Sequence, residues 1–138
     1  KSPRLRTFYT PQMSMDPENP GEYTYNPAKP RLIMEYLERK GLIENFHTEG
    51  DFPPLSREDY YIAHTKEMVD NFFDRGKTSR ILGVKWTPDY ARATTYEGAS
   101  LYHAIRYAVQ NPEEVCFSPS GAFHHANPTR GALFCPFS

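Results

Sequence analysis

Two neighbouring histidines, His124 and His125, are the residues of this sequence best suited to chemistry. They stand in "SGAFHHA", residues 120–126, shortly before Cys135 in "LFCPFS", residues 133–138. Because the imidazole pKa lies near neutral pH, one ring could take a proton from water and return it to a leaving group while its neighbour stabilises charge. The pair could instead belong to a metal site, although histidines that chelate a metal from one helix favour i,i+4 spacing. A third interpretation is that they are two polar rings in a solvated loop. The two residues alone leave all three interpretations open.

The residues before the pair indicate which elements hold it. Val115-Cys116-Phe117 is a short apolar run of β-forming residues between a helical pattern and a loop, which is typical of a strand buried on both faces of a parallel sheet. The histidines therefore follow the carboxyl end of a strand, where ligands and catalytic groups collect in open α/β sheets. Gly121 gives the backbone the freedom that two adjacent side chains need to face one site.

Strand and helix patterns alternate in the first third of the chain. β-Forming residues at positions 4–10 predict a strand, and a loop rich in Pro and Gly follows over residues 11–29. Pro30 can open a helix because it has no N–H to leave unpaired, and Gly41 supplies the stop. The apolar face of this helix is expected to comprise Leu32, Ile33, Tyr36 and Leu37.

Capping signals predict three further helices. Ser56 and Thr65 cap two short ones, the second of which ends at Gly76. Thr94 and Glu97 form the pattern of a capping box, so we expect the last helix to begin there. Its apolar face is expected to comprise Leu101, Ile105, Ala108 and Val109. We expect the remaining ring residues to pack or to make ordinary hydrogen bonds; these are His64, His103, Phe72, Phe73 and Trp86.

The composition is that of a folded protein and excludes several partners. With 138 residues the chain amounts to one domain or less, and its 38% hydrophobic residues suffice for a core. A formal charge of −1 without a basic stripe speaks against nucleic acid and against a membrane surface as partners. No apolar run approaches the ~20 residues of a membrane span. We therefore expect a cytoplasmic protein with reduced thiols at Cys116 and Cys135.

Several segments of the chain resemble the histone deacetylase family, including its bacterial acetoin-utilisation and acetylpolyamine-deacetylase branches. The most specific are "SGAFHHA" and "LFCPFS", whose spacing matches the family's His-His-Ala and Gly-Phe-Cys pattern. The weaker ones are "NPAKPRL" at residues 26–32, "YYIAHTKEMVDNF" at residues 60–72 and "TTYEGASLYHA" at residues 94–104. The resemblance implies an α/β fold. Residues 1–138 would be a single incomplete domain, the N-terminal part of a three-layer α/β/α parallel-sheet fold.

The same resemblance implies roles for individual residues. His125 would be the general base, and His124 its partner, in a zinc-dependent hydrolysis of acetylated lysine or an acetylated small amine. Phe134 would form one wall of the substrate channel, and the other residues expected to bind substrate are Leu133, Cys135 and Gly121. These roles are coherent, because an amide needs a polarising cation, a base within hydrogen-bond reach and an apolar sleeve for its methylenes.

The family's zinc ligands have no counterpart in this chain. They include an Asp-x-His pair, and that pattern occurs nowhere in the 138 residues. We therefore expect the N-terminal segment of a deacetylase-like enzyme that is inactive by itself. The alternative is a non-catalytic module that binds a partner or a small ligand. A partial parallel sheet leaves a strand edge exposed, so we also expect homo-oligomers formed through that edge.

Overall fold

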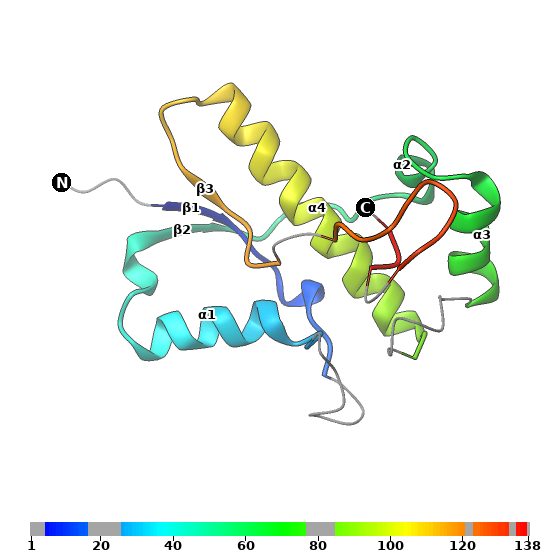
Figure 1. Cartoon of the computed structure of the whole chain (residues 1–138). Coiled ribbons are helices and arrows are strands. Elements are labelled where there is room, and N and C mark those ends of the chain that lie inside the picture. The colour runs from blue at the N-terminus through cyan, green and yellow to red at the C-terminus, as the bar shows by residue number, and fades with distance from the viewer. Residues whose placement is uncertain (1–4, 17–25, 77–84, 121–122, 133–134, 138) are drawn as a thin grey trace.

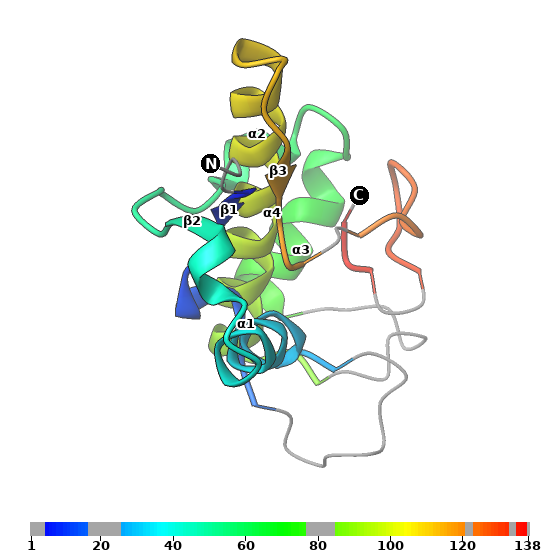
Figure 2. The same ribbon diagram turned by 90° about the vertical axis from the view of Figure 1, so that its left-hand side faces the viewer.

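The computed structural model describes residues 5–16, 26–76, 85–120, 123–132 and 135–137. Within these ranges the chain forms a parallel sheet of three strands, β1 (Leu5–Phe8), β2 (Phe46–Glu49) and β3 (Cys116–Phe117), in the order β2-β1-β3. Figure 2 shows β1 between its two neighbours. The helices are α1 (Lys29–Arg39), α2 (Arg57–Tyr60), α3 (Lys66–Arg75) and α4 (Pro88–Gln110), with 3-10 turns η1 (Pro11–Met13) and η2 (Ile43–Asn45).

The parallel sheet confirms the predicted α/β class, but β3 differs from the expectation. Thr7 of β1 pairs with Phe117 and Arg6 pairs with Cys116. Cys116 and Phe117 are only half-buried, and Val115 is 72% exposed. The prediction of a strand buried on both faces is therefore wrong. In the described sheet β3 is an edge strand, so it has a neighbour on one side alone.

Helices lie on both sides of this sheet. Figure 1 shows α1 on one side and the C-terminal half of α4 on the other. The α4 side is the better packed, because Phe8 lies there in one buried cluster with Met13, Phe52, Ala99 and Ala104. On the opposite side of the sheet, the ring centroids of Phe46 and Phe117 are 6.3 Å apart across β1.

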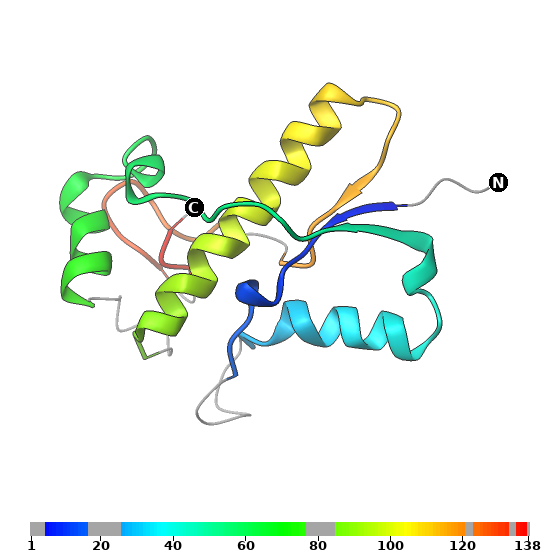
Figure 3. The same ribbon diagram turned by 180° about the vertical axis from the view of Figure 1, so that it is seen from behind.

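A second buried cluster lies at the N-terminal half of α4. It consists of Tyr60, Val69, Phe72, Tyr90 and Phe137. Figure 3 shows α2, α3 and the C-terminal loop grouped there, away from the sheet. Trp86 packs edge-on against Phe72 with 6.2 Å between centroids, as expected of a packing residue. Helix α4 thus runs through both clusters and joins them.

Helix α4 begins earlier than predicted. Thr87 is its N-cap, since the Thr87 hydroxyl accepts a hydrogen bond from the backbone N–H of Tyr90 at 3.0 Å, and Pro88 occupies the first turn. The capping box at Thr94 and Glu97 is wrong, because both side chains are buried within the helix. The predicted apolar face is wrong as well. Its Ile105 and Val109 are 55% and 75% exposed, whereas the buried face carries the small residues Ala93, Ala99, Ser100 and Ala104.

The shorter helices agree better with the sequence. Ser56 forms a capping box with Asp59, Thr65 caps α3, and Gly76 ends α3 in the left-handed region at φ 59°. Helix α1 likewise starts beside Pro30 and is followed by Gly41 at φ 68°.

The predicted apolar face of α1 and the predicted loop need correction. Leu32 and Tyr36 are 43% and 49% exposed, while Pro30 and Met34 are the buried residues of α1. Of the loop expected over residues 11–29, the first three form η1, whose Met13 is fully buried against α4. Within the described ranges, no helix is long and apolar enough to span a bilayer.

Candidate active site

The two histidines lie together in the loop after β3. The ring centroids of His124 and His125 are 4.0 Å apart and their planes are inclined by 44°. The backbone N–H of His124 donates to the Sγ atom of Cys135 at 3.4 Å. Cys135 is fully buried, whereas His124 is exposed and His125 is half-buried. Water can therefore reach the imidazole pair, while the backbone beneath it is held against the protein interior.

The C-terminal loop is closed by its own hydrogen bonds. The backbone N–H of Asn127 donates to the carbonyl of Arg130 at 2.9 Å, and the Asn127 side-chain oxygen accepts from the N–H of Thr129 at 2.9 Å. Further on, the N–H of Cys135 donates to the carbonyl of Ala132 at 2.9 Å. Such bonds turn the chain back on itself, so Cys135 returns beneath the histidines.

The turn between α2 and α3 anchors this loop. The backbone N–H of Thr65 donates to the carbonyl of Pro128 at 2.8 Å. The Nδ1 atom of His64 lies 3.0 Å from the carbonyl of Asn127, and since a carbonyl only accepts, Nδ1 carries the proton. His64 is 6% exposed and its ring lies 5.4 Å from that of Phe137. The hydrogen bond of His64 is therefore a positioning contact for the segment that follows the histidine pair.

A serine on α4 holds the other end of the segment. The hydroxyl of Ser100 donates to the carbonyl of Phe8 at 2.5 Å and lies 2.6 Å from the hydroxyl of Ser118. Ser100 is fully buried, and Ser118 directly follows β3. Because Phe8 ends β1, this contact ties the carboxyl ends of two adjacent strands to α4. The chain that leads to His124 thus leaves the sheet from a fixed point.

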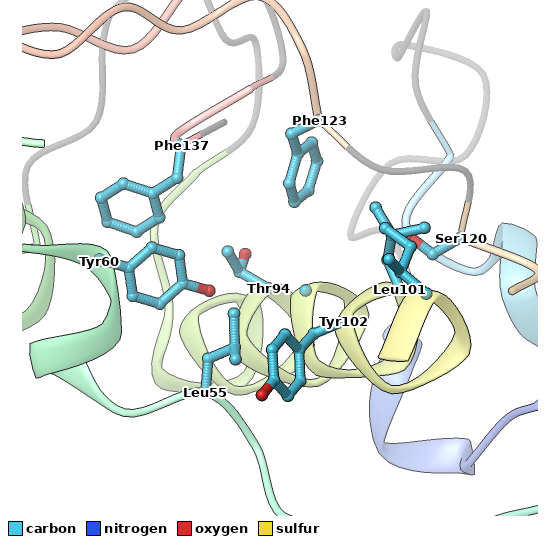
Figure 4. A pocket seen from close by; sticks show the side chains of 10 residues that line it. Leu55, Tyr60, Thr94, Leu101, Tyr102, Ser120, Phe123 and Phe137 are labelled. Carbon is cyan, nitrogen blue, oxygen red and sulfur yellow. The ribbon is translucent and has the colours of Figure 1, made fainter. Parts of the chain in front are cut away.

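An apolar cavity of about 290 Å³ adjoins the loop. Residues that line it include Leu55 and Tyr60, Leu101 and Ile105 of α4, and Phe123 and Phe137 from the C-terminal segment. Figure 4 shows Leu55, Leu101, Phe123 and Phe137 around the space, with the Tyr60 hydroxyl turned toward the other labelled residues. Neither histidine of the pair lines this cavity. The imidazoles and the cavity are therefore neighbouring but separate features.

Burial and nearby charges shift the pKa values of two tyrosines and one histidine in this part of the molecule. Burial raises the pKa of Tyr60, and the charges of Glu97 and Asp59 raise it further. The pKa of Tyr90 is raised in the same way, by burial first and by Glu97 second. Both phenols are therefore neutral hydrogen-bond donors at physiological pH. On the outer part of α4, burial lowers the pKa of His103, whose ring packs 5.6 Å from Phe52.

The described residues do not form a zinc site. Among them, no group of three or more His, Cys, Asp and Glu side chains is arranged to hold a metal ion. Cys135 lies against the histidine pair, and its Sγ atom accepts a hydrogen bond from the His124 N–H. A tetrahedral zinc site needs at least three protein ligands, so the ion implied by the family resemblance would need ligands beyond the described residues.

Of the residues predicted for the site, the structure brings His124, His125 and Cys135 together. Gly121, Leu133 and Phe134 lie outside the described residues, so the predicted channel wall stays a prediction. The sequence interpretation missed the anchoring role of His64. The sequence signal for this role was the i,i+4 spacing of Tyr60 and His64, which predicts that the two rings face the same side of the chain. In the structure both rings are buried.

Comparison with models of known protein families finds no match for this chain, and comparison with curated proteins finds none either. The resemblance to deacetylases therefore stands on the sequence motifs. The geometry adds a paired imidazole site after a parallel strand, held by buried contacts from α4 and from the turn before α3.

Proposed function

We propose that this chain is the N-terminal segment of a deacetylase-like amide hydrolase that acts on acetylated lysine or acetylated small amines. The observation that carries the proposal is the pair of imidazoles, 4.0 Å apart in the loop that follows β3. Its support is the match of "SGAFHHA" and "LFCPFS" to the family pattern. The three-layer fold of that family is part of the same proposal.

The chemistry of the chain's own residues is acid–base catalysis. His125 would accept a proton from the water that attacks the acetyl carbonyl carbon, and would return a proton to the amine nitrogen as the C–N bond breaks. The neighbouring His124 would stabilise the charge that develops during attack. A cation that polarises the carbonyl is the further requirement of this reaction, and the family resemblance names zinc. Ligands for zinc would have to come from outside the described residues.

The pair must be correctly held for this role. Deprotonating a water requires the base to lie within hydrogen-bond reach of it, so the loop has to keep its conformation when substrate binds. The anchors at Ser118, His64 and Cys135 supply that support from three separate elements. The two free cysteines agree with a cytoplasmic location, which we include in the proposal. Self-association through the exposed edge of the sheet stays a prediction.

The test is acetate release from an acetyl-lysine peptide and from acetylputrescine, measured with the full-length gene product in the presence of zinc. His125→Ala should lower kcat by about 10²- to 10⁴-fold, the usual contribution of a general base. Its urea midpoint should stay unchanged, because the His125 side chain is partly exposed. The matched control is His47→Ala, since His47 lies exposed on β2.

Turnover that survives His125→Ala would refute the assigned role. A wild-type protein without turnover on either substrate would favour the alternative, a non-catalytic module. The module would retain the fold for binding rather than for hydrolysis.

A further inference from the structure

The cavity beside α4 has the composition of a small-molecule site. Its volume of about 290 Å³ lies at the lower end of the range for ligand pockets, about 300–1,000 Å³, which suits a molecule with one ring. The walls are mainly aliphatic and aromatic, and they come from α4, from α2 and the segment before it, and from the C-terminal segment. Such a space excludes strongly hydrated ligands, because they would lose water without replacing its hydrogen bonds.

One polar group is directed into this apolar space. Tyr60 is 7% exposed, and Figure 4 shows its hydroxyl pointing inward. No hydrogen bond to this hydroxyl is formed within the described ranges; the groups acting on it are the charges of Glu97 and Asp59. Since Tyr60 lines the cavity, a ligand with an acceptor atom could take the hydrogen bond of this phenol.

The surroundings of Tyr60 select the kind of acceptor. Glu97 is 3% exposed and its charge acts on the Tyr60 phenol, and Asp59 adds a second negative charge. The apolar walls cannot replace the water around an anionic ligand, so a neutral carbonyl is the better match. The rings of Tyr60 and Phe137 are 4.3 Å apart, and Phe123 adds another aromatic wall. Aromatic walls favour an aromatic ligand through offset or edge-to-face contacts.

We propose that this cavity binds a small neutral aromatic molecule through a carbonyl group that accepts a hydrogen bond from Tyr60. The site is distinct from the imidazole pair, and the proposal does not depend on the hydrolase activity. Ile105 is 55% exposed and lines the space, so it joins the cavity to the protein surface. Leu101 and Leu55 form aliphatic walls for the ring.

The test uses acetophenone and ethylbenzene, which have nearly the same shape and differ in the carbonyl acceptor. Dissociation constants are measured by NMR titration of the labelled chain. Tyr60→Phe keeps the ring and removes the donor. It should weaken acetophenone roughly two- to tenfold, the worth of one neutral hydrogen bond, and should leave ethylbenzene unchanged. Benzoate should bind more weakly than acetophenone, because the apolar walls do not replace the water around its carboxylate.

Two variants control for indirect effects. Ile105→Trp should abolish the binding of both ligands by filling part of the cavity that Ile105 lines, without loss of stability, because Ile105 is half exposed. Tyr36→Phe changes an exposed tyrosine of α1 and should alter neither affinity. The proposal is overturned if acetophenone shifts no resonances up to its solubility limit, or if Tyr60→Phe affects both ligands equally. A dimer that covers the cavity and excludes acetophenone would overturn it too.

Discussion

Replacing Ser100 by alanine should weaken the whole molecule, because one hydroxyl joins α4 to two strands. The Ser100 hydroxyl is bonded to the Phe8 carbonyl at 2.5 Å and to the Ser118 hydroxyl at 2.6 Å, in a fully buried position. Alanine leaves the Phe8 carbonyl without this donor, and a buried unsatisfied group costs about 1–3 kcal/mol. Ser118 is half-buried, so its hydroxyl can bond to water in place of Ser100. The loss of this second hydrogen bond therefore adds little to the destabilisation. We expect the free energy of unfolding to fall by about 1–3 kcal/mol.

The assay is urea unfolding followed by the fluorescence of Trp86, which packs against Phe72 in the other buried cluster. Ser118→Ala is the matched control, since it removes the same kind of hydroxyl but keeps the bond from Ser100 to Phe8. Its cost should be smaller. The double variant should be about as stable as Ser100→Ala alone, because the two serines share one contact. A Ser100→Ala protein within about 0.5 kcal/mol of the wild type would refute the reasoning.

Two further predictions concern the helices. Gly76 and Gly41 both have positive φ, 59° and 68°, but an added Cβ would lie 3.0 Å from Trp86 Cε3 at Gly76 and would meet nothing within 4 Å at Gly41. Gly76→Ala should therefore lower the thermal midpoint more than Gly41→Ala does, and equal losses would contradict the packing against Trp86. Hydrogen bonds from Lys66 first and Tyr61 second lower the pKa of Asp70 from 3.8 to about 2. Because the pKa is lowered in the folded state, the stabilisation is present above about pH 4 and is lost as the pH falls toward 2. Urea midpoints between pH 2 and 6 should show this slope, and Asp70→Asn should flatten it; an unchanged slope would exclude Asp70 as its source.

The elements that could be predicted from sequence are those with local signals. Capping residues at Ser56 and Thr65, and glycines with positive φ at Gly41 and Gly76, act within a few residues and stand where the helices begin or end. The strand over Leu5–Phe8 also follows local β propensity. Strand β2 was not predicted, because its sequence "FHTE" is short, largely exposed and polar. Only its pairing with β1 makes it a strand.

Helix α4 shows why the remainder was harder to predict. Its buried face carries Ala93, Ser100 and Ala104, which have little hydrophobic signal but allow close approach to η1, β1 and β3. Its exposed face carries Ile105 and Val109, which dominate the helical periodicity. The spacing of Thr94 and Glu97 matches a capping box, yet the Thr94 hydroxyl donates to the carbonyl of Tyr90 one turn earlier, inside the helix.

The sequence predicted where along the chain the candidate site lies, but not which residues hold it in place. Adjacent histidines after a strand indicate a site beyond the carboxyl end of that strand, and in the structure the two rings lie 4.0 Å apart in the loop that follows β3. The supporting contacts of His64, Ser100 and Ser118 join residues far apart in sequence. Such contacts depend on how the helices pack, and no local pattern specifies them.

The passage of α4 through both buried clusters limits how this gene can change in length. Since an α-helix turns about 100° per residue, one inserted or deleted codon between Tyr90 and Ala99 would rotate one cluster away from its partners. Tyr90 packs in the cluster with Phe137, and Ala99 packs in the cluster with Phe8. Homologous chains should therefore vary in length before α4 or in the turn that follows it, and keep the number of residues between these two positions constant.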